Sequence, residues 1–266
     1  MFFVIDVGNS HTVTGLYSKN KLVGQWRLKS DRKSTSDELA ISYDSLFTMA
    51  GIDKKKVRGV VLASVVPTLE TAWVSCCRQF FSSNLDQDIF VVAVDDIKDL
   101  ITVQLENPKE VGADRLVNAI AAWNIFKSNL IVIDFGTAIT FDCVTSDCAY
   151  TGGIILPGIA ISLEALANKT AKLPHIDVSE MPPSIIGKTT VQAMKSGILF
   201  GYGSMIDGLV EGIKVEMAQS NKGAINVVAT GGMAQLIEPF TTTINQIDPM
   251  LTLNGLKIIY NMKVKR

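Results

Sequence analysis

The chain has 266 residues, of which 47% are hydrophobic and 19% are charged. A chain of this length and apolar content can bury a full core in one or two domains, which excludes disorder along the whole chain. The 25 Lys and Arg residues nearly balance the 26 Asp and Glu residues, leaving a formal charge of −1. This balance argues against a general nucleic-acid or membrane-surface binder, because such proteins usually carry a basic excess.

The first residues of the chain and its cysteines argue against a secreted, membrane-spanning or disulfide-rich protein. Asp6 interrupts the apolar first residues before a signal-peptide core could form, and no charge-free stretch reaches the ~18 residues of a membrane span. We therefore expect a cytoplasmic protein with no membrane partner. The chain has four cysteines: Cys76, Cys77, Cys143 and Cys148. They form no Cys-x-x-Cys pair and have only two histidines beside them, which favours buried thiols over disulfides or a zinc site.

The first segment of the chain has the pattern of hairpin-linked strands followed by a helix. Short apolar runs separated by turn residues predict antiparallel strands that begin at about residues 4, 12 and 22. Thr35 and Glu38 have the spacing of a capping box, which predicts a helix over residues 37–50.

The next segment predicts a strand, a helix and a strand. A β-branched run favours a strand over residues 57–63, and we expect Thr68 to cap the helix that follows. The apolar residues of this helix recur at steps of three and four: Leu69, Ala72, Trp73, Cys76, Cys77 and Phe80. That spacing is typical of a face turned toward the core. A further buried strand is expected over residues 89–94.

The second half of the sequence repeats this order. After a helix expected from about Gly112 to Phe126, the run Ile133–Gly136 mirrors Ile5–Gly8 about half a chain later. Further strands are expected over residues 130–134, 138–144, 149–156 and 224–229, with helices at about 190–217 and after Gly231-Gly232. We predict a duplicated βββαβ unit in an α/β fold, because internal similarity at a fixed offset outweighs a single propensity. The expected domains are residues 1–116 and 117–266.

Three predicted turns follow strands and contain glycine. They are Asp6–Ser10, Asp134–Ala138 and Ala229–Ala234. Glycine lets an anion approach the backbone N–H groups without meeting a Cβ, although one such turn alone is ordinary turn chemistry. Two acidic turns in equivalent positions of repeated lobes would face each other across a cleft, where amides bind phosphates and carboxylates hold Mg²⁺ or another cation. The sequence therefore predicts a nucleotide between the lobes.

The two common phosphate loops are absent from the sequence. Gly187-Lys188-Thr189 resembles the end of a Walker loop, but Pro182 stands where that loop needs its first glycine. Gly201-Tyr202-Gly203 lacks the third glycine of a dinucleotide fold, since Ile206 occupies that position.

Asp114 and Arg115 offer a base and a cation for phosphoryl transfer at the start of a predicted helix. The alternative interpretation of this pair is structural. Asp114 would then be an ordinary first-turn carboxylate of the helix, and Arg115 its solvated partner.

Short sequence motifs, found in the same order along nearly the whole chain, resemble those of a known family. They are Asp6–Ser10, Asn107–Arg115, Asp134–Ala138, Gly152–Gly158, Thr170–Pro174, Gly187–Thr190 and Thr230–Gly232. With these motifs the chain resembles the type III pantothenate kinases, members of the actin-like, sugar-kinase and Hsp70 ATPase superfamily. The resemblance implies two actin-like (ribonuclease H-like) lobes, each a mixed five-stranded sheet flanked by helices, with a cleft between them.

The resemblance also implies an activity and its cofactors. It implies ATP-dependent phosphorylation of the primary hydroxyl of pantothenate, the first step of coenzyme A biosynthesis. It further implies Mg²⁺, a monovalent cation (K⁺ or NH₄⁺), and a homodimer in which the substrate pocket is shared between subunits, with no nucleic-acid partner.

Matching the motifs position by position implies a set of site residues. The ATP-binding residues would be Asp6, Val7, Gly8, Asn9, Ser10, His11, Thr12, Val13, Thr137, Gly231 and Gly232. The substrate-binding residues would be Leu105, Gly112, Ala113, Asp114, Arg115 and, from the partner chain, Thr190. Asp6 would hold Mg²⁺, Asp134 would hold K⁺, and Asp114 would be the catalytic proton acceptor.

Two positions depart from the pattern of the family. Ser10 stands where the family usually has Thr, which keeps the hydroxyl. Leu105 stands where relatives have a Tyr that contacts pantothenate, which leaves an apolar wall. Two other functions remain open at this point: a kinase of another small alcohol or sugar on the same fold, and a nonenzymatic accessory regulator, which would have no need for Asp114.

Overall fold

The computed structural model describes residues 1–81, 84–220 and 223–265. The chain divides into two compact units. Unit 1 contains residues 1–121 and 250–266, and unit 2 contains residues 122–249. None of the described helices is long and apolar enough to span a membrane.

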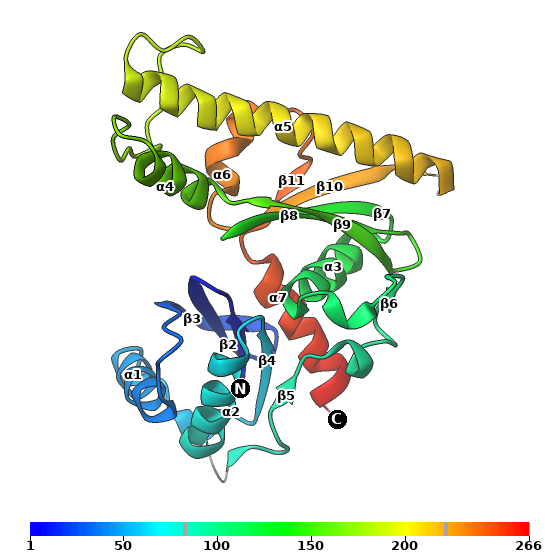
Figure 1. Cartoon of the computed structure of the whole chain (residues 1–266). Helices are drawn as coiled ribbons and strands as arrows, with labels where there is room; N and C mark the ends of the chain where they lie inside the picture. Colours follow the sequence, from blue (N-terminus) through cyan, green and yellow to red (C-terminus); the bar gives the residue numbers. More distant parts are fainter. Residues whose placement is uncertain (82–83, 221–222, 266) are drawn as a thin grey trace. The chain divides into compact units, whose positions relative to one another are not determined.

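Unit 1 is built on a five-stranded mixed sheet with the strand order β3-β2-β1-β4-β5 (Figure 1). Its strands are β1 (Phe2–Val7), β2 (His11–Ser18), β3 (Lys21–Lys29), β4 (Gly59–Ser64) and β5 (Phe90–Val91). β1 and β2 pair antiparallel, as do β2 and β3, whereas β4 runs parallel to both β1 and β5. The three predicted antiparallel strands are confirmed, while the predicted strand over 89–94 is reduced to two residues.

The other elements of unit 1 are helices, 3₁₀ turns and one short strand, β6 (Thr102–Val103), which belongs to the second sheet. The helices and turns are α1 (Ser36–Met49), α2 (Pro67–Phe81), the first part of α3 (Ala113–Phe126), α7 (Leu251–Ile259), the π-helix η6 (Tyr260–Val264), and the 3₁₀ turns η1 (Lys54–Lys56), η3 (Val94–Asp96) and η4 (Pro108–Glu110). The predicted capping box of α1 is confirmed: Glu38 N donates to Thr35 Oγ1 (3.3 Å) and Thr35 N to Glu38 Oε2 (2.8 Å). The prediction that Thr68 caps α2 is wrong, because the helix already begins at Pro67, whose fixed φ suits the first helical position.

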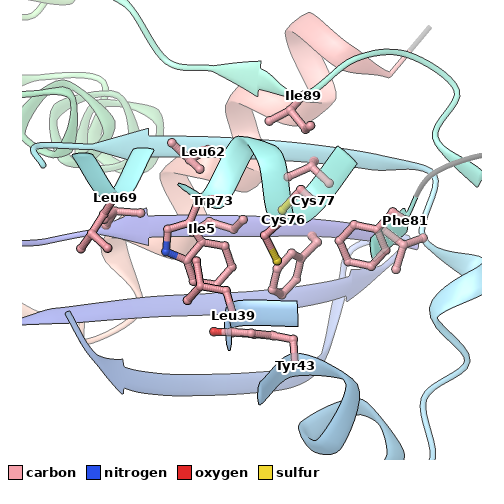
Figure 2. Close-up of a cluster of buried hydrophobic side chains, with 14 of the residues drawn as sticks. Ile5, Leu39, Tyr43, Leu62, Leu69, Trp73, Cys76, Cys77, Phe81 and Ile89 are labelled. Carbon is pink, nitrogen blue, oxygen red and sulfur yellow. The ribbon is translucent and has the colours of Figure 1, made fainter. Parts of the chain in front are cut away.

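The core of unit 1 lies where α1 and α2 pack on the sheet. Figure 2 shows Trp73 and Cys76 of α2 beside Tyr43 of α1 and Ile5 of β1. The rings of Tyr43 and Trp73 pack edge to face with their centroids 5.0 Å apart. Cys76 and Cys77 are buried thiols as predicted, and Cys148 of unit 2 is buried as well, while Cys143 is only half-buried.

Unit 2 repeats the topology of unit 1. Its strands are β7 (Asn129–Phe135), β8 (Ala138–Val144), β9 (Ala149–Pro157), β10 (Ile225–Thr230) and β11 (Gln246–Ile247). The second sheet has six strands where the sequence predicted five, because the short strand β6 lies beside β9. The five strands of unit 2 follow the order β11-β10-β7-β8-β9, with β7–β8 and β8–β9 antiparallel and β7–β10 and β10–β11 parallel. The same order and the same directions occur in β5-β4-β1-β2-β3, so the predicted duplication is confirmed.

The duplication extends to an irregularity in the sheets. The register between β2 and β3 shifts between Leu16 and Tyr17, and that between β8 and β9 shifts between Cys143 and Val144. Leu16 pairs with Phe3 of β1 and Cys143 with Ile131 of β7, positions equally far from Asp6 and Asp134. A β-bulge at the same place in both halves bends the two hairpins alike.

The helices of unit 2 cover one face of its sheet (Figure 1). They are α4 (Ile159–Lys169), α5 (Thr190–Ser220), α6 (Ala234–Ile237) and the 3₁₀ turn η5 (Glu238–Phe240). The helix predicted at about 190–217 is therefore confirmed as one long helix, whose Ile198, Ile206 and Val210 pack in the core. Neither α4 nor α7 was expected from the sequence.

The division into units differs from the sequence-based domains 1–116 and 117–266 at the end of the chain. Residues 250–266 belong to unit 1, because α7 packs against β1, β2 and β4. Gly255 also lets α7 pack closely on α3, since a Cβ there would lie 2.3 Å from the Val117 carbonyl oxygen.

Candidate active site

The turn after β1 places backbone amides and small polar side chains at the surface. Gly8 N donates to His11 O (3.1 Å), and a Cβ at Gly8 would lie 2.9 Å from that oxygen, so the turn needs glycine here. Asn9, Ser10 and His11 are exposed at its tip, where Arg32 Nη2 donates to Asn9 Oδ1 (3.1 Å). An exposed turn of this kind, with a cationic side chain beside it, can accept an anion.

Asp6 and Asp114 belong to neighbouring parts of unit 1. Asp6 is half-buried on β1, next to Val7. Val65, just after β4, donates its N–H to Val7 O (3.1 Å), and its Cγ1 would lie 3.3 Å from a Cβ at Gly112. The end of β1, which carries Asp6, and the start of α3 therefore both lie against Val65.

The Asp114 carboxylate folds back over the start of its own helix. Arg115 N donates to Asp114 Oδ1 (2.8 Å), and this oxygen would lie 2.5 Å from a Cβ at Gly112. A side chain at position 112 would therefore displace the carboxylate from this position. Burial raises the pKa of Asp114, while the backbone hydrogen bond from Arg115 and the Arg115 charge partly oppose this shift. A carboxylate with a raised pKa is a stronger proton acceptor than an ordinary aspartate.

In unit 2, Asp134 lies against a glycine in the left-handed region. Gly231 has φ +92°, and a Cβ there would lie 2.5 Å from Asp134 Oδ1 and 2.6 Å from Phe135 N. The second glycine turn resembles the first: Gly136 N donates to Ala138 O (3.1 Å), and Thr137 is exposed at the tip. Asp134, Thr137 and Gly231 are thus brought together at one end of β7 and β10.

One further residue of unit 2, Gly158, shapes this end of the sheet. Gly158 N donates to Thr137 O (3.1 Å), and a Cβ at Gly158 would lie 2.2 Å from the same oxygen. The position of Gly158 directly after Pro157 was part of the family motif, but its contact with Thr137 could not be predicted without the fold.

The residues around Asp134 fit a cation with oxygen ligands. Strand register places Thr140 of β8 and Thr230 of β10 on either side of Asp134. Carboxylate and hydroxyl oxygens suit hard cations such as Mg²⁺ and K⁺. Within the described part of the chain, no three His, Cys, Asp or Glu side chains gather as a metal cluster. A cation here would therefore also need hydroxyl, carbonyl, water or phosphate oxygens.

Two neighbouring threonines at the start of α5 have different surroundings. Thr189 Oγ1 accepts the N–H of Gln192 (3.2 Å), and Gln192 Oε1 accepts the N–H of Lys188 (2.9 Å), which together cap the helix. The segment around Gly187 is therefore a helix cap. Thr190 is exposed at the first position of α5.

The predicted site residues divide between the two units. Unit 1 carries the turn Asp6–Val13, the half-buried Leu105 between β6 and η4, and Gly112–Arg115. Unit 2 carries Asp134, Thr137, Thr190, Gly231 and Gly232. Sequence reasoning missed the contribution of Val65, Thr140 and Thr230, because their positions depend on the pairing of strands.

A family model described as type III pantothenate kinase matches residues 2–212. A curated type III pantothenate kinase from Desulfotalea psychrophila is 60% identical over 266 residues, covering 100% of both chains. The chain belongs to the type III pantothenate kinase family.

The fold of this member of the type III pantothenate kinase family also occurs in solved structures of low sequence identity. A structure assigned as a 2-dehydro-3-deoxygalactonokinase, from Sinorhizobium meliloti, superposes with a TM-score of 0.57 at 10% identity, covering 100% of this chain and 98% of that one. Component A of the (R)-2-hydroxyglutaryl-CoA dehydratase from Acidaminococcus fermentans reaches 0.54 at 15% identity, with 96% and 94% covered. These two proteins have different names and the same fold, so such a likeness shows the fold alone.

Proposed function

We infer that the chain uses ATP to phosphorylate pantothenate in coenzyme A biosynthesis, and we propose that Asp114 is the general base of this reaction. Family membership supports the activity. The position and raised pKa of the Asp114 carboxylate support its role. An alcohol has a pKa far above neutrality, so a positioned base assists by accepting the proton as the new O–P bond forms.

The two glycine turns support the proposed binding of ATP. Phosphoryl transfer depends mainly on positioning the phosphates and neutralising their charge. The exposed tips at Ser10 and Thr137 offer amides and hydroxyls to phosphate oxygens. We propose that both turns contribute to the binding of a single ATP, together with Gly231 and Gly232.

The half-buried aspartates of β1 and β7 support the proposed cation sites. Asp6 would hold Mg²⁺, and Asp134 would hold K⁺ or NH₄⁺. When bound, such cations supply positive charge that offsets the charge of the phosphates. The chain itself provides the carboxylates at the ends of β1 and β7, beside the turns that would receive the phosphates.

Exposed apolar side chains support a homodimer whose partner subunit contributes Thr190. The segment that leads into α5 and the first turn of this helix expose Met181, Ile185, Ile186 and Val191. Several large apolar side chains exposed within one segment are typical of a surface that a partner covers. Light scattering at assay concentration tests this proposal. We expect a dimer, and a fully active monomer would contradict the shared pocket.

The acceptor is tested by following ADP release from ATP with Mg²⁺ and K⁺. We expect release with pantothenate and only background release with a panel of sugars and small alcohols. Release with a sugar alone would favour the kinase alternative. Release with no acceptor in the panel would favour the nonenzymatic regulator, for which an intact Asp114 has no evident use.

A further inference from the structure

Asp142 is the one charged residue among the buried side chains of the described ranges, and it is 0% exposed. It lies on β8 of unit 2. Tyr150 donates its hydroxyl to Asp142 Oδ1 (2.7 Å), and Thr140 donates its hydroxyl to Asp142 Oδ2 (3.3 Å). Burying a carboxylate is unfavourable even when it is hydrogen-bonded, and an apolar side chain would fill the same place without that cost. Because burial of this carboxylate is unfavourable for stability, we expect a function that requires it.

The strand register connects Asp142 to Asp134. Thr140 is the cross-strand partner of Asp134, and Asp142 lies two residues further along β8. Side chains alternate between the two faces of a strand, so Asp134, Thr140 and Asp142 share one face of the sheet. Directly opposed residues of an antiparallel pair have Cβ atoms about 4.5–5.5 Å apart, which brings the Thr140 hydroxyl within reach of a cation held by Asp134.

The hydrogen bond to Asp142 determines how Thr140 presents its oxygen. A threonine hydroxyl has one proton to donate and two lone pairs to offer. Because the proton is donated to Asp142, the lone pairs remain for other partners. The negative charge of Asp142 on the same face also favours a cation electrostatically.

We propose that Thr140 is a ligand of the monovalent cation held by Asp134, and that Asp142 is the positioning residue that orients the Thr140 hydroxyl. This inference rests on the proposed role of Asp134. Thr230, the neighbour of Asp134 on β10, completes a row of oxygen-bearing side chains across three adjacent strands.

The test uses the full-length protein without nucleotide. The thermal unfolding midpoint is measured during titration with KCl, at ionic strength held constant with NaCl. A cation that binds the folded state raises this midpoint. The variants are Thr140→Val, which removes the hydroxyl and keeps the shape, Thr140→Ser, which keeps the hydroxyl, and Asp142→Asn. Asp134→Asn is the reference for the cation site, and Thr151→Val is the matched control, since Thr151 donates to the Cys143 carbonyl elsewhere in the sheet.

We expect Thr140→Val to need at least about tenfold more K⁺ than the wild type for the same rise in midpoint, and Asp142→Asn several-fold more. Thr140→Ser and Thr151→Val should stay within about twofold of the wild type. If Thr140→Val does not fold, Asp142→Asn decides, because it removes the charge and keeps a polar side chain at that position.

Two outcomes would overturn the proposal, and they differ in what else they affect. If Asp134→Asn loses the response to K⁺ while Thr140→Val and Asp142→Asn keep it unchanged, the cation site stands and the roles of Thr140 and Asp142 fall. If the wild type shows no response to K⁺, or Asp134→Asn retains it, the cation role of Asp134 falls together with the roles of Thr140 and Asp142.

Discussion

At the scale of single residues, the environment of Asp114 predicts the pH dependence of the reaction. Burial raises its pKa above the ordinary aspartate value of 3.8. The base must be ionised to accept a proton, so kcat should fall as the pH drops through this raised pKa. A pH–rate profile measures this limb. A limb at or below the ordinary aspartate value would contradict the assignment.

The same shift predicts how Asp114 affects stability. A carboxyl group whose pKa is higher in the folded than in the unfolded state destabilises the fold when ionised, and the penalty is relieved as the pH falls below both values. Asp114→Asn removes the charge and keeps an oxygen for the Arg115 N–H. Its urea midpoint at neutral pH should therefore equal or exceed that of the wild type. A marked decrease would show that the carboxylate stabilises the fold.

Gly231 offers a second residue-scale prediction. Its positive φ and the contacts of a Cβ with Asp134 and Phe135 should make Gly231→Ala destabilising by about 1–3 kcal/mol or more. Gly51→Ala is a matched control, since Gly51 has φ +64° but no atom within 4 Å of the added Cβ. Chemical denaturation should show the larger loss at Gly231. Equal losses would mean that the contact with Asp134 is unimportant.

At the scale of elements, the glycines of α5 predict opposite effects of one substitution. A Cβ at Gly203 would lie 2.1 Å from the Phe240 carbonyl oxygen, so Gly203→Ala should cost about 1–3 kcal/mol through overpacking. A Cβ at Gly201 would have no atom within 4 Å, so Gly201→Ala should stabilise the helix by about 0.5–1 kcal/mol. Thermal unfolding of the two variants measures both. Changes of the same sign would contradict the close packing of α5 against η5.

Elements with local signals could be predicted from the sequence. Thr35 and Glu38 form a capping box within four residues, which fixed the start of α1. The start of α2 was misjudged because Thr68 looks like a cap, whereas the preceding Pro67 suits the first turn better. The strand over 138–144 was predicted, yet the role of Thr140 could not be, because only the register shows that it faces Asp134.

At the scale of the whole molecule, the end of the chain is part of the N-terminal unit. Leu251, Leu256 and Ile259 of α7 are 0% exposed. Fully burying one such side chain contributes ~1.5–3 kcal/mol. The three together therefore contribute about as much as the whole free energy of unfolding of a typical protein, which is ~5–15 kcal/mol. Deleting residues 250–266 should therefore leave unit 1 unfolded, as measured by soluble yield and circular dichroism.

A control for this deletion is Met262→Ala, because Met262 is exposed. It should leave folding unchanged, whereas a stable, soluble deletion variant would contradict the packing of α7. The return of α7 to β1 could not be predicted from the sequence, because it depends on contacts between distant parts of the chain.

The duplication was predictable because Asp6 and Asp134 stand in the same motif, and the topology of the two sheets confirms it. The grouping of the candidate site could be predicted only in part. Sequence motifs indicated Gly112 and Gly231, but not that each gives room to an aspartate carboxylate.

The transfer of phosphate to pantothenate by wild type and Asp114→Asn tests the account most directly. It is measured in a single turnover with ATP, Mg²⁺ and K⁺, alongside ATP binding by each protein. We expect unchanged ATP binding and a rate lower by about 10²–10⁴-fold in the variant. A variant rate within about threefold of the wild type would contradict Asp114 as the base.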